Sequence, residues 1–342
     1  MTADVSAIVV SYADPIAAAA TARTLLEQSA PPLEVLVVDN GGEPGEPGTA
    51  WPPGVRALPP AGNVGYVLAC NRAAAQARGR WLLFVNPDAP ADRDCLARLH
   101  AAAEEDPDVA IVGAQVLLPG GERVNAGENP VHLTGLCWSG RFEQPRENGP
   151  ARDVLAVSGA ALMVRADVFA ALGGFEPGYF MYHDDVDVCW RARLAGWRVR
   201  FVPEATVVHD YAFEKGAGKW FWLERNRAWT VLSNYGAGTL LLLAPLLLAT
   251  ELAVLALALS NGWAREKLRA WGAVLRGLPA LLRWRRRVQA LRRTPDAEIV
   301  ALMAARMDTP LLDAPAVRAA GPLLAAYRAA VLSVLRRAAR SR

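Results

Sequence analysis

Short apolar runs that alternate with helical stretches constrain the fold of this sequence more than any other feature. Residues 5–10, 33–38 and 81–85 are rich in β-branched or large apolar side chains, which is typical of strands buried on both faces of a parallel sheet. Predicted helices over 16–28 and 67–77 separate these strands. Strand, helix and strand at this spacing form a right-handed βαβ unit. We therefore predict an α/β domain built on a mostly parallel central sheet.

Polar side chains follow these strands at the points where the strands end. Ser11 and Tyr12 follow the first strand, Asp39 and Asn40 end the second, and Asp88 follows the third. In such sheets ligands bind beyond the carboxyl ends of the strands, so we expect these residues to line a ligand crevice. No GxGxxG motif follows the first strand, which argues against a dinucleotide site.

Asp88 and His209 are candidates for a metal site, because His209 also stands at the end of the second of two predicted strands (198–202 and 206–208). A carboxylate and one imidazole suit Mg²⁺ or Mn²⁺ better than a structural zinc, and such a cation would neutralise a diphosphate. Taken singly, Asp88 could instead be a turn residue, and His209 a hydrogen-bonded structural residue.

The segment 174–197 carries three carboxylates, Asp184, Asp185 and Asp187, within four positions. The apolar spacing that follows predicts a helix whose first turn holds these acids and which Gly196 closes. A helix N-terminus favours negative charge, so carboxylates there are expected to stay ionised and to act as bases at neutral pH. An acidic N-terminal turn with a solvated face is the structural alternative.

Charge divides the chain into two parts. Residues 1–236 hold 20 Lys and Arg against 28 Asp and Glu, whereas residues 237–342 hold 17 against 6. We therefore expect a domain over 1–236 and a basic, apolar helical region over 237–342 whose partner is anionic, either lipid or nucleic acid. The four cysteines form no CxxC and are expected to be reduced thiols. No signal peptide is expected at the N-terminus.

The apolar run 240–259 is just long enough to span a bilayer. A single span would place the basic stretch 265–293 outside, against the tendency of Lys and Arg to stay in the cytosol. Pro245 and Glu251 also interrupt the run, so we expect a kinked or re-entrant helix in one leaflet, with Trp263, Trp271 and Trp284 at headgroup level. A helical hairpin packed in the core is the alternative. The run and the tryptophans favour lipid over nucleic acid as the partner.

Seven motifs in order resemble family 2 glycosyltransferases, and their rhamnosyltransferase-like branch in particular. They are VSY at 10–12, VVDN at 37–40, NVGY at 63–66 with Asn71, NPDA at 86–89, SGAALMVR at 158–165, GGFEPGYFMYHDDVDVCWRARLAGW at 173–197 and VVHD at 207–210. The resemblance covers about residues 4–235.

The resemblance implies a GT-A fold, a nucleotide-diphospho-sugar donor, a divalent metal and inversion at the anomeric carbon. It places Asp185 as the catalytic base, and Asp88, the last acid of a metal motif whose first acid is Asn86 here, as a metal ligand together with His209. The donor nucleotide is assigned to Ser11, Tyr12, Asp39, Asn40, Asn63, Gly65 and Asn71. Acceptor or phosphate contacts are assigned to Asp184, Asp187, Trp190 and Arg191, although Arg191 on a solvated helix face is equally compatible with the sequence.

Together these features predict an inverting, metal-dependent glycosyltransferase that uses Mg²⁺ or Mn²⁺. Its donor would be a nucleotide-diphospho-sugar such as dTDP-rhamnose, and its acceptor a lipid-linked or polysaccharide hydroxyl in cell-envelope glycan synthesis. We expect it on the cytoplasmic face of the membrane, peripheral or monotopic, with no nucleic-acid partner. A non-catalytic protein that binds sugar nucleotides or lipid is the alternative.

Overall fold

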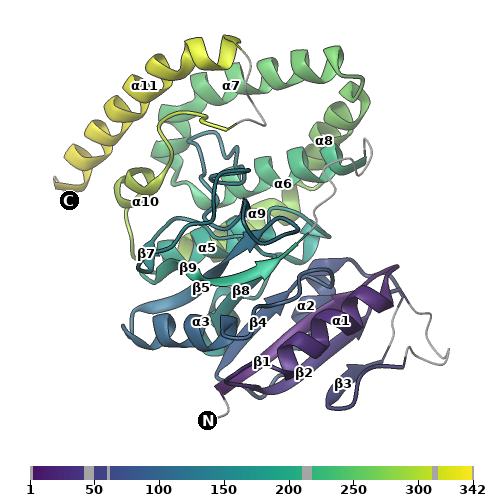
Figure 1. Ribbon diagram of the computed structural model, residues 1–342. Coiled ribbons are helices and arrows are strands. Elements are labelled where there is room, and N and C mark those ends of the chain that lie inside the picture. The colour runs from purple at the N-terminus through teal and green to yellow at the C-terminus, as the bar shows by residue number, and fades with distance from the viewer. Residues whose placement is uncertain (1–2, 42–49, 60–61, 210–217, 310–314, 341–342) are drawn as a thin grey trace. The chain divides into compact units, whose positions relative to one another are not determined.

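The computed structural model describes residues 3–41, 50–59, 62–209, 218–309 and 315–340, and these residues form two compact units. The described residues of Met1–Asn129, Ser139–Ala192 and Trp197–Tyr211 make the first unit. Pro130–Trp138, Arg193–Gly196 and Ala212–Arg342 make the second, which is mainly helical (Figure 1).

One mixed sheet organises the first unit, with strand order β3-β2-β1-β4-β8-β5-β9-β7, and β6 paired to β5 off this path. The strands are β1 (Ala3–Ser11), β2 (Pro32–Asp39), β3 (Val55–Leu58), β4 (Trp81–Val85), β5 (Val109–Leu117), β6 (Val124–Ala126), β7 (Arg152–Asp153), β8 (Ala161–Arg165) and β9 (Arg198–Val208). Parallel pairs join β3, β2, β1 and β4, and another joins β5 to β9. The three strands expected at the start of the chain are therefore present and parallel.

β8 lies antiparallel between β4 and β5, and this reversal shapes the site. Ala161 at the start of β8 pairs with Val85 at the end of β4. The loop that enters β8 therefore lies at the same edge as the carboxyl ends of the parallel strands. Asn86 N donates to Ala160 O over 3.0 Å and extends this pairing by one step.

The helices of the first unit are α1 (Pro15–Leu26), α2 (Tyr66–Ala74), α3 (Cys95–Glu104), α4 (Ala166–Leu172) and α5 (Asp184–Leu194), with a 3₁₀ turn η1 (Pro177–Tyr179). α1 begins where Asp14 accepts a hydrogen bond from Ala17 N over 2.9 Å and Pro15 occupies the first helical position. α1 and α2 pack on β1 and β2, and α3 packs on β5 and β9. The apolar faces of α1 and α3 form one hydrophobic core with the buried strands.

The sequence predicted two strands over 198–208, but the structure has one, β9. Its pairing with β5 shifts register between Ala114 and Gln115. Gln115 Nε2 donates to Pro203 O over 2.6 Å at this shift. The side chain thus replaces a ladder hydrogen bond and keeps the strand continuous.

Six helices belong to the described part of the second unit: α6 (Gly218–Asn234), α7 (Ala237–Ser260), α8 (Ala264–Arg276), α9 (Leu278–Ala290), α10 (Asp296–Leu302) and α11 (Pro315–Arg340). The loop 130–138 packs with them, because Tyr235 Oη donates to Leu133 O and Arg227 Nη1 donates to Thr134 O, each over 3.0 Å. The predicted boundary at 236 places α6 in the first domain, whereas α6 packs within the second unit.

Candidate active site

Backbone and amide hydrogen bonds join the ends of β1 and β2 to the loop before α2. Asn40 N donates to Ser11 O over 2.8 Å, and the Asn40 amide donates to Asn63 Oδ1 over 3.2 Å. Asn40 Oδ1 in turn accepts from Val64 N, and Asn63 Oδ1 accepts from Gly65 N. Four of the predicted donor residues, Ser11, Asn40, Asn63 and Gly65, are thus brought together.

Tyr12 and Asp39 lie at the same edge. Tyr12 is 56% exposed, an unusual state for a large aromatic side chain that follows a buried strand. Asp39 Oδ1 accepts a hydrogen bond from Gly41 N over 3.2 Å. A Cβ on Gly41 would lie within 4 Å of both the Tyr12 ring and Asp39 Oδ1. The exposed ring can stack on a nucleotide base, and the carboxylate beside it can accept a hydrogen bond from a sugar hydroxyl of the nucleotide.

Gly65 and Asn71 attach α2 to the segment that precedes α5. Gly65 has a φ of 85°, and a Cβ there would lie 2.4 Å from the Phe180 ring, so glycine is required. The Asn71 side chain donates to Phe175 O and accepts from Phe175 N, over 2.9 and 3.0 Å. These bonds make Asn71 a residue that positions the segment after Gly174.

Asp88 and His209 meet as the sequence predicted. His209 Nε2 lies 2.9 Å from Asp88 Oδ1, and the imidazole is buried while the carboxylate is exposed. The His209 backbone is held by two bonds, from His209 N to Leu117 O and from the Asn125 amide to His209 O. The neighbouring Asp210 of the VVHD motif lies outside the described residues.

Asp185 stands in the first turn of α5 and contacts the loop that enters β8. Its Oδ2 accepts from Gly159 N over 2.9 Å, and its Oδ1 accepts from Val186 N over 2.8 Å. A Cβ on Gly159 would lie 3.1 Å from Asp185 Cβ, so this approach is close. Since Gly159 precedes β8, Asp185 lies at the carboxyl edge of the parallel strands, as do Asp88 and His209.

Asp184 differs from the expectation that the acids of this turn stay ionised. Burial raises the pKa of Asp184 to about 8, and the charges of Asp185 and Asp187 act in the same direction, against a lowering backbone hydrogen bond. The helix N-terminus does not offset the loss of solvent at this position. Asp184 therefore holds its proton at neutral pH.

Asp187, Trp190 and Arg191 are fully buried, which corrects their predicted role in acceptor or phosphate binding. Arg191 Nε donates to Asp187 Oδ2 over 2.7 Å, and Arg191 Nη1 donates to Leu172 O over 2.9 Å. The spacing of four positions suits this pair on one helix face. The pair holds α5 in the core, and the alternative of a solvated face for Arg191 is also wrong.

The sequence did not single out Gly159, Phe180 and Asn125 as site residues. Phe180, Tyr182 and His183 all have positive φ, an uncommon backbone state that occurs preferentially at functional sites. The motif SGAALMVR contained Gly159, but its contact with Asp185 joins positions 26 residues apart and has no local sequence signal.

The raised pKa of Asp184 predicts a pH effect on stability. Between pH of about 4 and 8 the folded chain keeps a proton that the unfolded chain releases, so unfolding becomes easier as pH rises through this window. Asp184→Asn should remove this slope. Melting temperatures of both proteins from pH 5 to 8 should diverge in favour of the variant, whereas two parallel curves would contradict the assignment.

The sequence model of Glycosyl transferase family 2 matches residues 6–173. N-acetylglucosaminyl-diphospho-decaprenol L-rhamnosyltransferase of Mycobacterium tuberculosis is 32% identical over 211 residues, which cover 54% of this chain and 69% of that relative. Rhamnosyltransferase WbbL of Escherichia coli is 42% identical over 52 residues, 15% of this chain and 20% of the relative.

Among solved structures, GalNAc-T7 with UDP, GalNAc and Mn²⁺ aligns with a TM-score of 0.54 at 15% identity, over 67% of this chain and 47% of that chain. At this identity the likeness concerns the fold alone, and it confirms the predicted GT-A fold. The share of the rhamnosyltransferase that aligns, together with the family match, decides the assignment. The chain belongs to glycosyltransferase family 2 and is a glycosyltransferase.

Proposed function

We propose that this enzyme transfers L-rhamnose from dTDP-rhamnose, with inversion, to a hydroxyl of a lipid-linked or polysaccharide acceptor in cell-envelope glycan synthesis. Two relatives support the sugar, since both are named as rhamnosyltransferases. One of these names, N-acetylglucosaminyl-diphospho-decaprenol L-rhamnosyltransferase, supports the lipid-linked acceptor.

The placement of Asp185 carries this proposal. Its carboxylate is fixed by Gly159 N–H at the sheet edge where Asp88 and His209 also lie. An acceptor hydroxyl must lose its proton as its oxygen attacks the anomeric carbon, and a positioned carboxylate can accept that proton. Direct attack of this kind forms the new C–O bond on the face opposite the leaving diphosphate and inverts the anomeric centre.

The donor nucleotide is assigned to the edge formed by β1 and β2. The Tyr12 ring would stack on the base, and Asp39 would accept a hydrogen bond from the 3′-hydroxyl of the deoxyribose. Asn40 and Asn63 hold the loop before α2 in place through their shared hydrogen bond. The base, deoxyribose and diphosphate would then follow the sheet edge from β2 toward Asp88.

Asp88 and His209 would hold the divalent cation. One carboxylate oxygen and one imidazole nitrogen within 2.9 Å of each other fit Mg²⁺ or Mn²⁺. Among the described residues no group of three or more His, Cys, Asp or Glu is arranged to hold a metal. Donor oxygens and water would complete the coordination. When bound, the cation neutralises charge on the leaving diphosphate.

We place the enzyme at the cytoplasmic face of the membrane, because nucleotide sugars are cytosolic and a lipid-linked acceptor is membrane-bound. Two described helices, over Ala237–Ser260 and Val317–Arg340, are long and apolar enough to meet the membrane. The division into a catalytic domain and a membrane-associating region remains part of this proposal.

Replacing the base tests the mechanism. Asp185→Asn keeps an acceptor for Gly159 N–H but cannot take a proton, so turnover should fall by about a hundredfold or more while dTDP binding is unchanged. Asp167→Asn, in a surface ion pair with Arg165, is the control and should turn over normally. Wild-type turnover in Asp185→Asn would remove this residue as the base.

Removing a metal ligand tests the cation site. Asp88→Ala and His209→Ala should each weaken Mn²⁺-dependent binding of dTDP in calorimetry, because each removes one of two protein ligands. His100→Ala, whose imidazole pairs with Asp4 on the surface, should bind normally. Transfer at full rate in excess EDTA would show that no divalent cation takes part.

The donor assignment predicts selective stabilisation by dTDP-sugars. With Mn²⁺ present, dTDP-rhamnose should raise the melting temperature more than UDP- or GDP-hexoses do, because Tyr12 and Asp39 would contact its thymine and deoxyribose. Tyr12→Ala should reduce that difference. Strong stabilisation by UDP-hexoses with none by dTDP-sugars would overturn the donor assignment.

A further inference from the structure

One face of α7 presents a stripe of leucines to solvent. Leu241, Leu248, Leu252 and Leu259 are each between 57% and 77% exposed. Their spacing of seven, four and seven positions places them on one side of the helix. In the most apolar 18-residue window of α7 only 6% is buried, so α7 is not the core hairpin that the sequence left open. An apolar surface of this extent indicates a partner.

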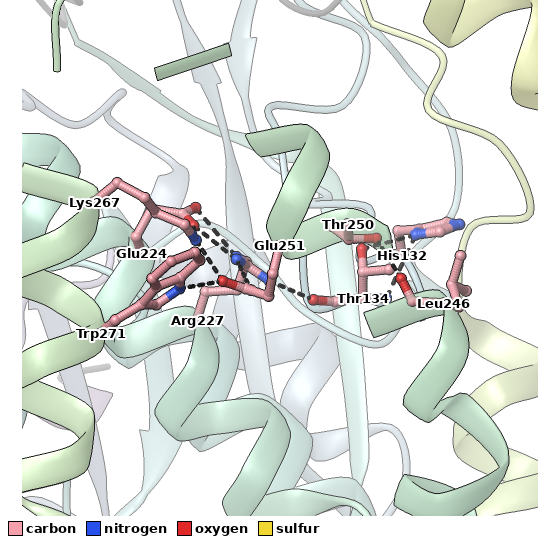
Figure 2. A network of polar contacts seen from close by, with 9 residues as sticks. All are labelled: His132, Thr134, Glu224, Arg227, Leu246, Thr250, Glu251, Lys267 and Trp271. Atoms are coloured by element: carbon pink, nitrogen blue, oxygen red, sulfur yellow. Dashed lines mark hydrogen bonds and ion pairs between the residues drawn. The ribbon is translucent and has the colours of Figure 1, made fainter. Parts of the chain in front are cut away.

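One flank of α7, about 80° around the helix from the centre of the stripe, carries Glu251, and that carboxylate is held by two cations. Glu251 Oε1 lies 2.5 Å from Arg227 Nη2 of α6, and Glu251 Oε2 lies 2.6 Å from Lys267 Nζ of α8 (Figure 2). Trp271 of α8 also donates its indole N–H to Glu251. Glu251 thus attaches the middle of α7 to both neighbouring helices.

A second carboxylate balances the charge of this network. Glu224 accepts from Arg227 Nε and Nη2 over 3.1 and 2.7 Å and also contacts Lys267 (Figure 2). Two acids and two bases leave no net charge in a cluster that is nearly closed to solvent. Burial alone would raise the pKa of Glu251, but Arg227 and Lys267 lower it to about 2.

This network is incompatible with α7 as a membrane span. α7 has 24 residues and is about 36 Å long, and Glu251 lies roughly 21 Å from its start, so a spanning α7 would place Glu251 deep in the hydrocarbon. Arg227 and Lys267 would have to enter with it, together with the exposed Arg265 and Arg269 of α8. Charges at that depth are costly, so the span would break the network.

The neighbouring helices carry exposed side chains that are suited to bind an anionic membrane surface. Leu275 at the end of α8 and Leu278 and Leu282 at the start of α9 are exposed. Exposed arginines, among them Arg276 and Arg283, flank them. Apolar side chains beside arginines, in a region with 17 basic against 6 acidic residues, match acyl chains beside anionic headgroups.

We propose that α7 lies in the plane of an anionic leaflet, with its leucine stripe among the acyl chains and Glu251 attaching the flank of the helix to α6 and α8. The inference rests on the proposed membrane location but not on the donor, the acceptor or the reaction. An in-plane helix also replaces the kinked or re-entrant helix that the sequence predicted.

Vesicle binding tests the stripe without any transfer assay. Leu241→Gln/Leu248→Gln should weaken cosedimentation with phosphatidylglycerol-containing vesicles by about tenfold or more. Ile16→Gln/Leu33→Gln, two exposed apolar residues of the first unit, should bind as the wild type does. Equal loss in both variants, or none in the first, overturns the proposal. The proposal is also overturned if the wild type is a dimer and Leu241→Gln/Leu248→Gln converts it to a monomer.

A separate variant tests whether Glu251 attaches α7 to α6 and α8. Glu251→Gln leaves buried Arg227 and Lys267 with one carboxylate, so it should lower the melting temperature, since breaking a buried ion pair is strongly destabilising. Glu298→Gln, on the exposed side of α10, should change it little. Equal melting temperatures for both variants would overturn this role.

Cysteines introduced one at a time at the two ends of α7 test its orientation relative to the membrane. Gly238→Cys and Asn261→Cys, both at exposed positions, are treated with an impermeant maleimide in sealed spheroplasts. The parent chain, in which Cys70, Cys95 and Cys189 are buried, measures background labelling. Both cysteines should react only after lysis. Labelling of either one before lysis overturns the in-plane assignment.

Discussion

The buried ion pair of Asp187 and Arg191 is the interaction on which the candidate active site depends. Both side chains are fully buried, and Arg191 also donates to Leu172 O. Removing one partner from such a pair typically costs about 3–5 kcal/mol, so the pair firmly fixes the rotation of α5 about its axis. Asp185 precedes Asp187 by two positions, about 200° around the helix, and is thereby turned toward Gly159 at the sheet edge.

Three acids in one helical turn therefore serve three purposes. Asp187 is neutralised by Arg191 in the core, and burial keeps Asp184 protonated near neutral pH. Asp185 accepts two backbone N–H bonds. Acids whose environments differ this much can take separate acid and base roles, and of the three only Asp185 is not buried and contacts the loop at the sheet edge.

The sequence predicted the parts of the site that depend on local pattern. Buried strands are visible as apolar runs, and the polar residues that follow them, such as Asp39 and Asp88, lie at one edge of the sheet because parallel strands end on the same side. The sequence-based prediction failed where a contact with a residue far along the chain determines the structure. Arg191, considered for a solvated helix face, instead forms an ion pair in the core. The two strands predicted on either side of Pro203 are one strand, because Gln115 bridges the register shift between β5 and β9. Glu251 looked like an interruption of an apolar run, because its partners on α6 and α8 have no signal within α7.

In the proposed mechanism, Asp185 deprotonates the acceptor for a single direct displacement at the anomeric carbon. The decisive measurement is the configuration of the new linkage, read from the one-bond carbon–proton coupling of the anomeric centre in the purified product. A single displacement gives the configuration opposite to that of the sugar in the donor. Retention of the donor configuration would require a second displacement and would rule out this mechanism.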